Sequence, residues 1–316
     1  MDKFDSLQGD IKSDDFGGST DRTVLGVGLV TLDVVQYIHR FPGRNEKLVA
    51  SDSYVGYGGP AANALATAVR LGVKGNLVSV LGDSEISEIL RAQLKIDNIG
   101  ILDASGLDRT DWHPPLSTVL VSIDTGERAV VSINGTTQPL VECPAEVLRD
   151  VSAVLVDGHY MKLCIAIAQE AHNVGIPVLL DGGSNKSGME ELLANVDIAV
   201  CSHDFKFDGE SDTLSGLKAR GIRYGAITNG SNPIEYYSDS VKGEVSISST
   251  VAVDTLGAGD VLHGALLAYI GKCGFQPREF GRYLTFASNV ATLSTESRGT
   301  RGWNVEDVSW SPITHD

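Results

Sequence analysis

The chain is short of basic residues. Its 316 residues include 25 lysines and arginines against 41 aspartates and glutamates, which gives a formal net charge of −16. A surface this acidic repels phosphate backbones, so we do not expect a protein that binds nucleic acid. No stretch approaches the ~20 consecutive apolar residues of a membrane span, so we expect no membrane partner. Apolar residues still make up 42% of the chain, which is typical of a globular fold.

Cysteine is scarce as well, and the four cysteines are dispersed without a Cys-x-x-Cys pair: Cys143, Cys164, Cys201 and Cys273. This spacing argues against structural zinc and against a disulfide framework, and it favours reduced thiols and a cytoplasmic location. Residues 1–22 are rich in Asp, Ser and Gly, and they lack the basic start and apolar core of a signal peptide. We therefore predict a disordered tail followed by a single domain over residues 23–316.

Short apolar strands alternate with helices in the C-terminal half. We expect strands at 153–157, 177–181, 198–201 and 224–228, with helices at 163–173, 189–195 and 211–219 between them. Helices of this length between short strands indicate right-handed crossovers and a parallel sheet. The sequence therefore predicts an α/β fold.

The N-terminal half does not fit this series. It contains extended segments at 24–30, 32–38 and 48–57, a helix at 60–71, a strand at 75–82 and a helix at 84–97. Two further apolar runs, 117–123 and 128–133, flank the sequence Asp-Thr-Gly-Glu, which is a hairpin signature. These segments suggest a small sheet attached to the main domain.

The segment with the clearest chemical meaning is 253–260, with the sequence VDTLGAGD. Gly257, Ala258 and Gly259 open an apolar helix, and their small side chains leave backbone N–H groups bare at its N-terminus, where anions bind. We call residues 257–260 the GAGD turn. Asp260 either stabilises the first turn of the helix or accepts a hydroxyl proton while the turn holds a transferring phosphoryl group.

A second segment, 58–66, has the sequence GGPAANALA. Gly58 and Gly59 either form a tight turn before a closely packed helix or let a ligand approach the backbone. Asn63 lies in the first turn of that helix and has both a donor and an acceptor to offer a polyol. Asp33 follows the first strand, where it is either a turn residue or a ligand contact at a strand end.

The GAGD turn, the upstream Asp254 and the Gly-Gly-x-x-x-Asn helix resemble the two signatures of the PfkB-type carbohydrate kinases. The resemblance runs from Val24 to about Trp303. It implies a ribokinase-like three-layer α/β/α domain with a mostly parallel sheet, and a β-sheet lid formed by about 32–57 and 112–133. It also implies ATP-dependent phosphorylation of a sugar hydroxyl with Mg²⁺, and a homodimer that pairs through the lid.

The resemblance assigns roles by motif position. Asp260 is the implied base and the other residues of the GAGD turn form the implied anion hole. The implied sugar contacts are Asp33, Gly58, Gly59 and Asn63. Arg128 is either a contact for phosphate or the far end of the sugar, or a solvated hairpin charge, and His159 is either a substrate contact or an ordinary strand-end histidine. ATP contacts are implied at Ser202, Thr228, Gly230, Gly257, Gly259, Ser288 and Asn289, and a monovalent cation such as K⁺ at Asp254 and the Leu256 carbonyl.

The sequence also departs from the family pattern. Many members carry Asn-x-x-Glu where this chain has Ser202-His203-Asp204-Phe205. Ketohexokinases have a similar Ser-x-Asp there, and the nearest resemblance is to the ketohexokinase and sulfofructose kinase group, which implies a ketose-like substrate. The alternatives are a nucleoside kinase, with an aromatic clamp from Tyr54, Tyr57 and Trp112, and a non-catalytic relative that binds sugar or nucleotide. The intact GAGD turn argues against the last.

Overall fold

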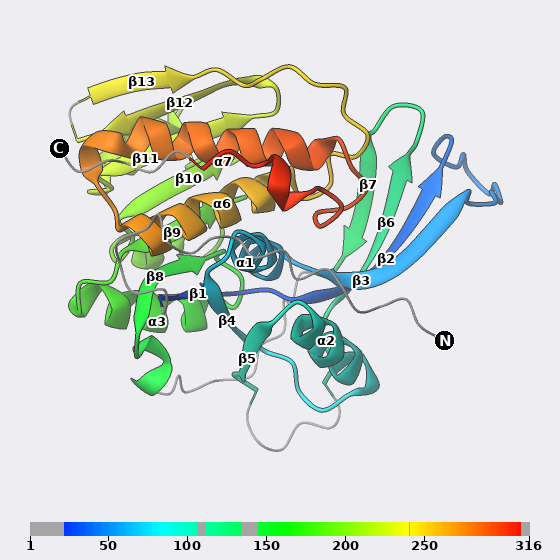
Figure 1. The fold of residues 1–316 in the computed structure, drawn as a ribbon, viewed down its shortest axis with the longest axis horizontal. Helices are drawn as coiled ribbons and strands as arrows, with labels where there is room; N and C mark the ends of the chain where they lie inside the picture. Colours follow the sequence, from blue (N-terminus) through cyan, green and yellow to red (C-terminus); the bar gives the residue numbers. More distant parts are fainter. Residues whose placement is uncertain (1–21, 106–111, 134–144, 240, 311–316) are drawn as a thin grey trace.

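The computed structural model describes residues 22–105, 112–133, 145–239 and 241–310 (Figure 1). Its main body contains a nine-stranded sheet. The strands are β1 (Thr23–Val27), β4 (Lys74–Ser79), β5 (Ile99–Asp103), β8 (Val151–Val156), β9 (Val178–Gly182), β10 (Ile198–Ser202), β11 (Tyr224–Asn229), β12 (Asn232–Ser238) and β13 (Val241–Val245). Their order is β13-β12-β11-β10-β9-β8-β1-β4-β5. All neighbours from β11 to β5 pair in parallel, and β12 and β13 add an antiparallel edge.

Helices cover both faces of this sheet, because the side chains of each strand alternate between two apolar cores. In β8, Leu155 belongs to one core, whereas Val154 and Val156 belong to the other. The first core is covered by α1 (Pro60–Arg70), α2 (Glu85–Ile96), α6 (Ala258–Cys273) and α7 (Phe280–Thr295). The second is covered by α3 (Met161–Asn173), α4 (Met189–Leu193) and α5 (Thr213–Ala219). Short 3-10 turns are η2 (Ala145–Leu148), η3 (Pro277–Glu279) and η4 (Val305–Asp307).

A smaller four-stranded sheet projects from one side of the main body (Figure 1). It consists of β2 (Thr31–Ile38), β3 (Asp52–Gly58), β6 (Leu116–Ser122) and β7 (Arg128–Ser132), in the order β3-β2-β6-β7. The two central strands pair in parallel, and each outer strand is antiparallel to its neighbour. One face of this sheet carries Val35, Tyr37 and Val119, which pack near Leu256. That face therefore looks toward the segment before α6.

The helices α1 and α6 touch through their backbones. A Cβ at Gly264 would collide with the carbonyl oxygen of Ala64, so only glycine allows this approach. Both helices also begin at a glycine with positive φ, which is 95° at Gly59 and 68° at Gly257. The contact brings the first turns of α1 and α6 close together.

The structure confirms the expected α/β class with a mostly parallel sheet and a second, smaller sheet. Three strands were not expected: β5, β12 and β13. The sequence analysis predicts no strand after residue 228, because residues 232–245 include Asn, Pro, Gly and Lys, which are rare in strands. The expected strand 48–57 begins only at Asp52. The predicted tail and Cys143 lie outside the described residues, apart from Arg22. Within the described ranges, no helix is long and apolar enough to cross a membrane.

Candidate active site

Asp260 lies in the first turn of α6 and is partly buried. Its Oδ2 atom accepts a hydrogen bond of 2.8 Å from the side-chain amide of Asn63, in the first turn of α1. Burial and, after it, the nearby charge of Asp181 raise the pKa of the Asp260 carboxyl to about 7, and the Asn63 bond, His263 and Arg128 oppose the shift. A carboxyl that titrates near neutral pH is suited to general acid–base chemistry.

The GAGD turn presents open backbone in front of this carboxylate. The first N–H groups of a helix have no partner within the helix. Ala258 N–H makes one long bond of 3.4 Å to the Thr255 carbonyl. A Cβ built at Gly259 would meet no atom within 4 Å, so the space beside this residue is free. A Cβ at Gly257 would instead collide with Thr300 Cγ2. Gly259 therefore leaves space for a ligand, whereas Gly257 allows close packing against Thr300.

Asn63 is buried and connects Asp260 to the C-terminal loop. While its amide nitrogen donates to Asp260, its Oδ1 atom accepts from Thr300 Oγ1 at 3.3 Å and from Arg301 Nη1 at 3.1 Å. One amide N–H remains for a ligand. The sequence predicts Asn63 as a sugar contact, and the structure adds that it holds Asp260 in place.

Asp33 lies in β2, on the face of the smaller sheet that looks toward α6. Its carboxylate accepts hydrogen bonds from Thr31 and Ser117. Burial raises the pKa of the Asp33 carboxyl, and these bonds together with the charge of Arg301 partly oppose the rise. Gly58 is directly beside it, since a Cβ there would collide with the Asp33 carboxylate. Asp33, Gly58, Gly59 and Asn63 are thus brought to one region.

Arg128, at the start of β7, reaches the segment that precedes the GAGD turn. Its Nη1 atom donates to the Thr255 carbonyl at 2.8 Å. This bond crosses from the smaller sheet to the main domain and places a positive charge near Asp260, whose pKa it lowers. Arg128 is thus exposed to solvent and also has a partner beside the GAGD turn, and its role as a substrate contact stays a prediction.

Asp254 is buried, and three donors reach its carboxylate. Leu256 N–H donates to Oδ1 at 2.8 Å, and Gly299 N–H and the Tyr37 hydroxyl donate to Oδ2 at 2.9 and 3.2 Å. An ionised carboxylate has about four acceptor positions. A cation at this place would share Asp254 with these donors and would take its other ligands from backbone carbonyls such as that of Leu256.

The predicted nucleotide contacts lie at the C-terminal ends of two neighbouring strands, as ligand sites in open α/β sheets do. Ser202 ends β10, where its hydroxyl accepts from Asp204 N–H at 3.2 Å, and Thr228 lies beside it in β11. Gly230 has a φ of 56° and open space around it. A cavity of about 390 Å³ adjoins these strand ends and is lined by residues that include His203 and Asn229.

The two predicted contacts on α7 differ from each other. Asn289 is exposed, whereas Ser288 is buried and its hydroxyl donates to the Thr285 carbonyl at 2.9 Å. Ser288 therefore points into its own helix. His159 is also turned inward: its backbone N–H donates to Asp157 at 2.8 Å, and its ring nitrogen Nδ1 lies 3.4 Å from the same carboxylate. These contacts join His159 to Asp157 rather than to Asp260.

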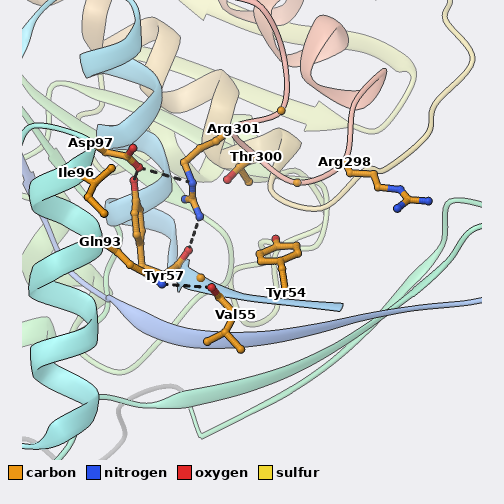
Figure 2. Close-up of a pocket in the computed structure, with 12 residues that line it drawn as sticks. Tyr54, Val55, Tyr57, Gln93, Ile96, Asp97, Arg298, Thr300 and Arg301 are labelled. Atoms are coloured by element: carbon orange, nitrogen blue, oxygen red, sulfur yellow. Dashed lines mark hydrogen bonds and ion pairs between the residues drawn. The ribbon is translucent and has the colours of Figure 1, made fainter. Parts of the chain in front are cut away.

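A cavity of about 410 Å³ lies between β3, the end of α2 and the loop 298–302 (Figure 2). Arg301 crosses it: its guanidinium stacks over the Tyr57 ring at 3.9 Å, donates to the Tyr57 carbonyl at 3.0 Å and holds Asn63. Tyr54 lines the same cavity, whereas Trp112 packs against the core on the α3 face. The sequence analysis did not predict Arg301, although its segment, Arg-Gly-Thr-Arg-Gly, is an unusual basic cluster in this acidic chain.

Known proteins resemble this chain over most of its length. A nucleoside kinase from Methanothermobacter thermautotrophicus is 28% identical over 315 residues and covers 92% of this chain and 94% of its own. Bacillus subtilis ribokinase is 22% identical over 292 residues, covering 89% and 95%. The structure of Arabidopsis thaliana ribokinase complexed with ribose and ATP superimposes with a TM-score of 0.68 at 21% identity, over 88% of this chain and 94% of that one.

The family-level match spans every residue of the site described above. The likeness to ketohexokinases in particular stays a prediction, whereas the wider resemblance carried by the two motifs is confirmed. The model of the pfkB family of carbohydrate kinases matches residues 21–307, and this chain therefore belongs to that family.

Proposed function

We propose that this protein transfers the γ-phosphoryl group of ATP to a hydroxyl of a small, ketose-like sugar. The observation that carries the proposal is the pairing of a carboxylate and an anion cradle. Asp260, whose pKa is raised to about 7, stands in the same helical turn as the open backbone of Gly259. A hydroxyl placed between them would lose its proton to Asp260 while the turn binds the phosphoryl group.

The sugar lies, in this proposal, between the smaller sheet and the first turn of α1. Asp33 is the acceptor for sugar hydroxyls, and the remaining Asn63 N–H is a donor. Arg128 closes the side next to the GAGD turn through its bond to Thr255. The smaller sheet thus acts as a lid, which excludes water so that ATP is not hydrolysed.

The nucleotide lies along the ends of β10 and β11. Ser202, Thr228, Gly230 and Asn289 are the proposed contacts on that side, and Ser288 supports the helix. Among the described residues, no group of three or more His, Cys, Asp or Glu side chains forms a metal cage. Mg²⁺ keeps several waters and is usually held by one or two carboxylates together with substrate phosphates, so it does not require such a cage. When bound, Mg²⁺ would neutralise the negative charge of the phosphates during transfer. K⁺ at Asp254 and a cytoplasmic location stay predictions.

We also propose a homodimer that forms through the outer face of the smaller sheet. Val55, Val34, Thr118 and Val131 lie in one row across its four strands, because each is opposite the next in register. Val55 is 52% exposed and Val131 75% exposed. A second copy would cover this apolar row with an equivalent one.

One experiment tests the activity. ADP release from ATP and Mg²⁺ is measured with a panel of ketoses, aldoses and nucleosides. We expect release with a ketose and none in the Asp260→Asn variant. If ADP is released mainly with a nucleoside, the substrate is a nucleoside instead of a sugar, as the name of the Methanothermobacter thermautotrophicus relative states for that protein. No release above the Asp260→Asn background with any acceptor would overturn the kinase proposal.

A further inference from the structure

His263 is a buried histidine behind the GAGD turn, one helical turn after Gly259. Its side chain is 4% exposed. Nδ1 lies 2.7 Å from the Gly259 carbonyl oxygen, and Nε2 lies 2.9 Å from the Val200 carbonyl oxygen in β10. A carbonyl oxygen only accepts hydrogen bonds, so each of these contacts requires a proton on the nitrogen.

A neutral imidazole cannot satisfy both contacts. It has one N–H, so its second nitrogen would place a lone pair against a carbonyl lone pair at hydrogen-bond distance. Turning the ring by 180° does not help, because ring carbons would then face both carbonyls. A buried polar group without a partner is costly, and in the doubly protonated ring both nitrogens have a carbonyl partner.

The opposite charge needed for a buried imidazolium is present. Asp181, in β9, places its Oδ2 atom 3.4 Å from Nδ1 of His263. This oxygen is buried and has no hydrogen-bond partner among the described residues. Burial raises the pKa of Asp181, and the His263 charge is the first influence that lowers it. The carboxylate of Asp181 is thus a counter-charge that no other hydrogen bond of the described residues engages at Oδ2.

We infer that His263 is held as a buried imidazolium and acts as the positioning residue of the GAGD turn. The inference rests on the proposed phosphoryl transfer. The Gly259 carbonyl and the Asp260 N–H belong to one peptide group, so a charged donor on the carbonyl polarises the N–H that faces the anion. The same positive charge opposes the rise in the pKa of Asp260.

His263 is not the only charge in this region. Other groups act on Asp181 or Asp260 from neighbouring elements: Asp157, His159 and Lys186 on the first, and Arg128 and Asp181 on the second. Among the described residues, the side-chain hydrogen bond to the Gly259 carbonyl comes from His263. In the part of the chain that the structure describes, the His263 ring links Gly259 of the anion-binding turn to Val200 of the sheet below it.

The protonation state can be measured without substrate. Protein labelled with ¹⁵N-histidine is examined by NMR at pH 8, with His263→Asn for assignment. We expect one histidine with two slowly exchanging ring N–H groups and an imidazolium nitrogen pattern, which is absent in the variant. Ring nitrogen signals of neutral imidazole for every histidine at pH 8 would overturn the inference. That outcome is measured on the parent protein, so it does not depend on the folding of the variant.

The effect on the base is measured by the pH profile of turnover. Without the imidazolium, the pKa of Asp260 should rise by about one unit, since a charge nearby shifts a carboxyl by roughly 1–3 units. The His263→Asn variant should therefore be about tenfold slower than the parent at pH 6.5 and within about threefold of it at pH 9. The matched control is His172→Asn, on the exposed surface of α3, with an unchanged profile.

A uniform loss of turnover at all pH values would mean that His263 only supports the fold, which would contradict the inference. If the parent itself releases no ADP, the proposed function fails, and the NMR result still decides the charge of His263.

Discussion

The two glycines of the GAGD turn should respond to alanine in opposite ways, although they are two residues apart. Gly257 has a left-handed backbone, and a Cβ there would meet Thr300 Cγ2. The left-handed conformation costs about 1–2 kcal/mol with a side chain, and overpacking adds roughly 1–3 kcal/mol. We therefore expect Gly257→Ala to lower the free energy of unfolding by about 2–5 kcal/mol.

Gly259 has neither constraint. It lies inside the first helical turn, and alanine favours a helix over glycine by up to about 1 kcal/mol. We expect Gly259→Ala to leave stability unchanged or slightly higher. Its methyl group would occupy the open space where the phosphoryl group is proposed to bind, so turnover should fall and the KM for ATP should rise.

Thr300→Ser separates the two costs at Gly257. It removes Cγ2 and keeps the hydroxyl that donates to Asn63. The Gly257→Ala, Thr300→Ser double variant should recover the overpacking term and retain a loss of about 1–2 kcal/mol. Urea unfolding followed by circular dichroism measures each variant. A Gly257→Ala protein as stable as the parent, or a double variant no better than the single one, would refute the steric reasoning. Normal kinetics in Gly259→Ala would remove that residue from the anion site.

Three further predictions concern the carboxylate, the amide and the dimer. Asp260→Asn should fold, bind ATP and lose about 10²–10⁴-fold in turnover. Because the pKa of Asp260 is raised in the folded state, ionisation of this buried carboxyl lowers the stability of the parent protein as pH rises through about 7. The variant should therefore have a higher free energy of unfolding than the parent at pH 8 but not at pH 4. Asn63→Ala should raise the sugar KM and also lower turnover, since Asn63 positions Asp260, while the KM for ATP changes little; a change in the KM for ATP alone would contradict this. Val131→Glu should give a monomer of about 34 kDa in sedimentation, whereas Val174→Glu, at the exposed residue that follows α3, should leave the dimer intact, and a monomeric parent would disprove the dimer.

The sequence predicts the site best where a motif and a helix start coincide. Gly257, Asp260 and Asn63 are close in space because both motifs open a helix, and a helix start has a definite backbone geometry. The contact between α1 and α6 is not visible in either motif, because it depends on Gly264, which reads as an ordinary helical residue.

The parts that were not predicted depend on contacts between distant segments. The roles of Arg301 and His263 depend on their hydrogen bonds to Asn63 and Val200, which are more than 60 residues away in the sequence in each case. The strands β12 and β13 were missed because one of their faces is exposed, so their apolar pattern is weak. Ser288 fits the family pattern in sequence, and its inward direction is visible only once the burial of α7 is known.

The backbone contact at Gly264 limits how this protein can change its substrate. The helices that carry Asn63 and Asp260 are already as close as two main chains allow, so mutations cannot narrow the gap, and larger residues at this contact would push the two helices apart and disturb the reaction itself. If the proposed sugar site is right, we expect acceptors of a different shape to require changes in the smaller sheet, where Asp33, Tyr54 and Arg128 lie in β2, β3 and β7. Libraries for altered specificity should vary β2, β3 and β7 and leave the α1–α6 pair untouched.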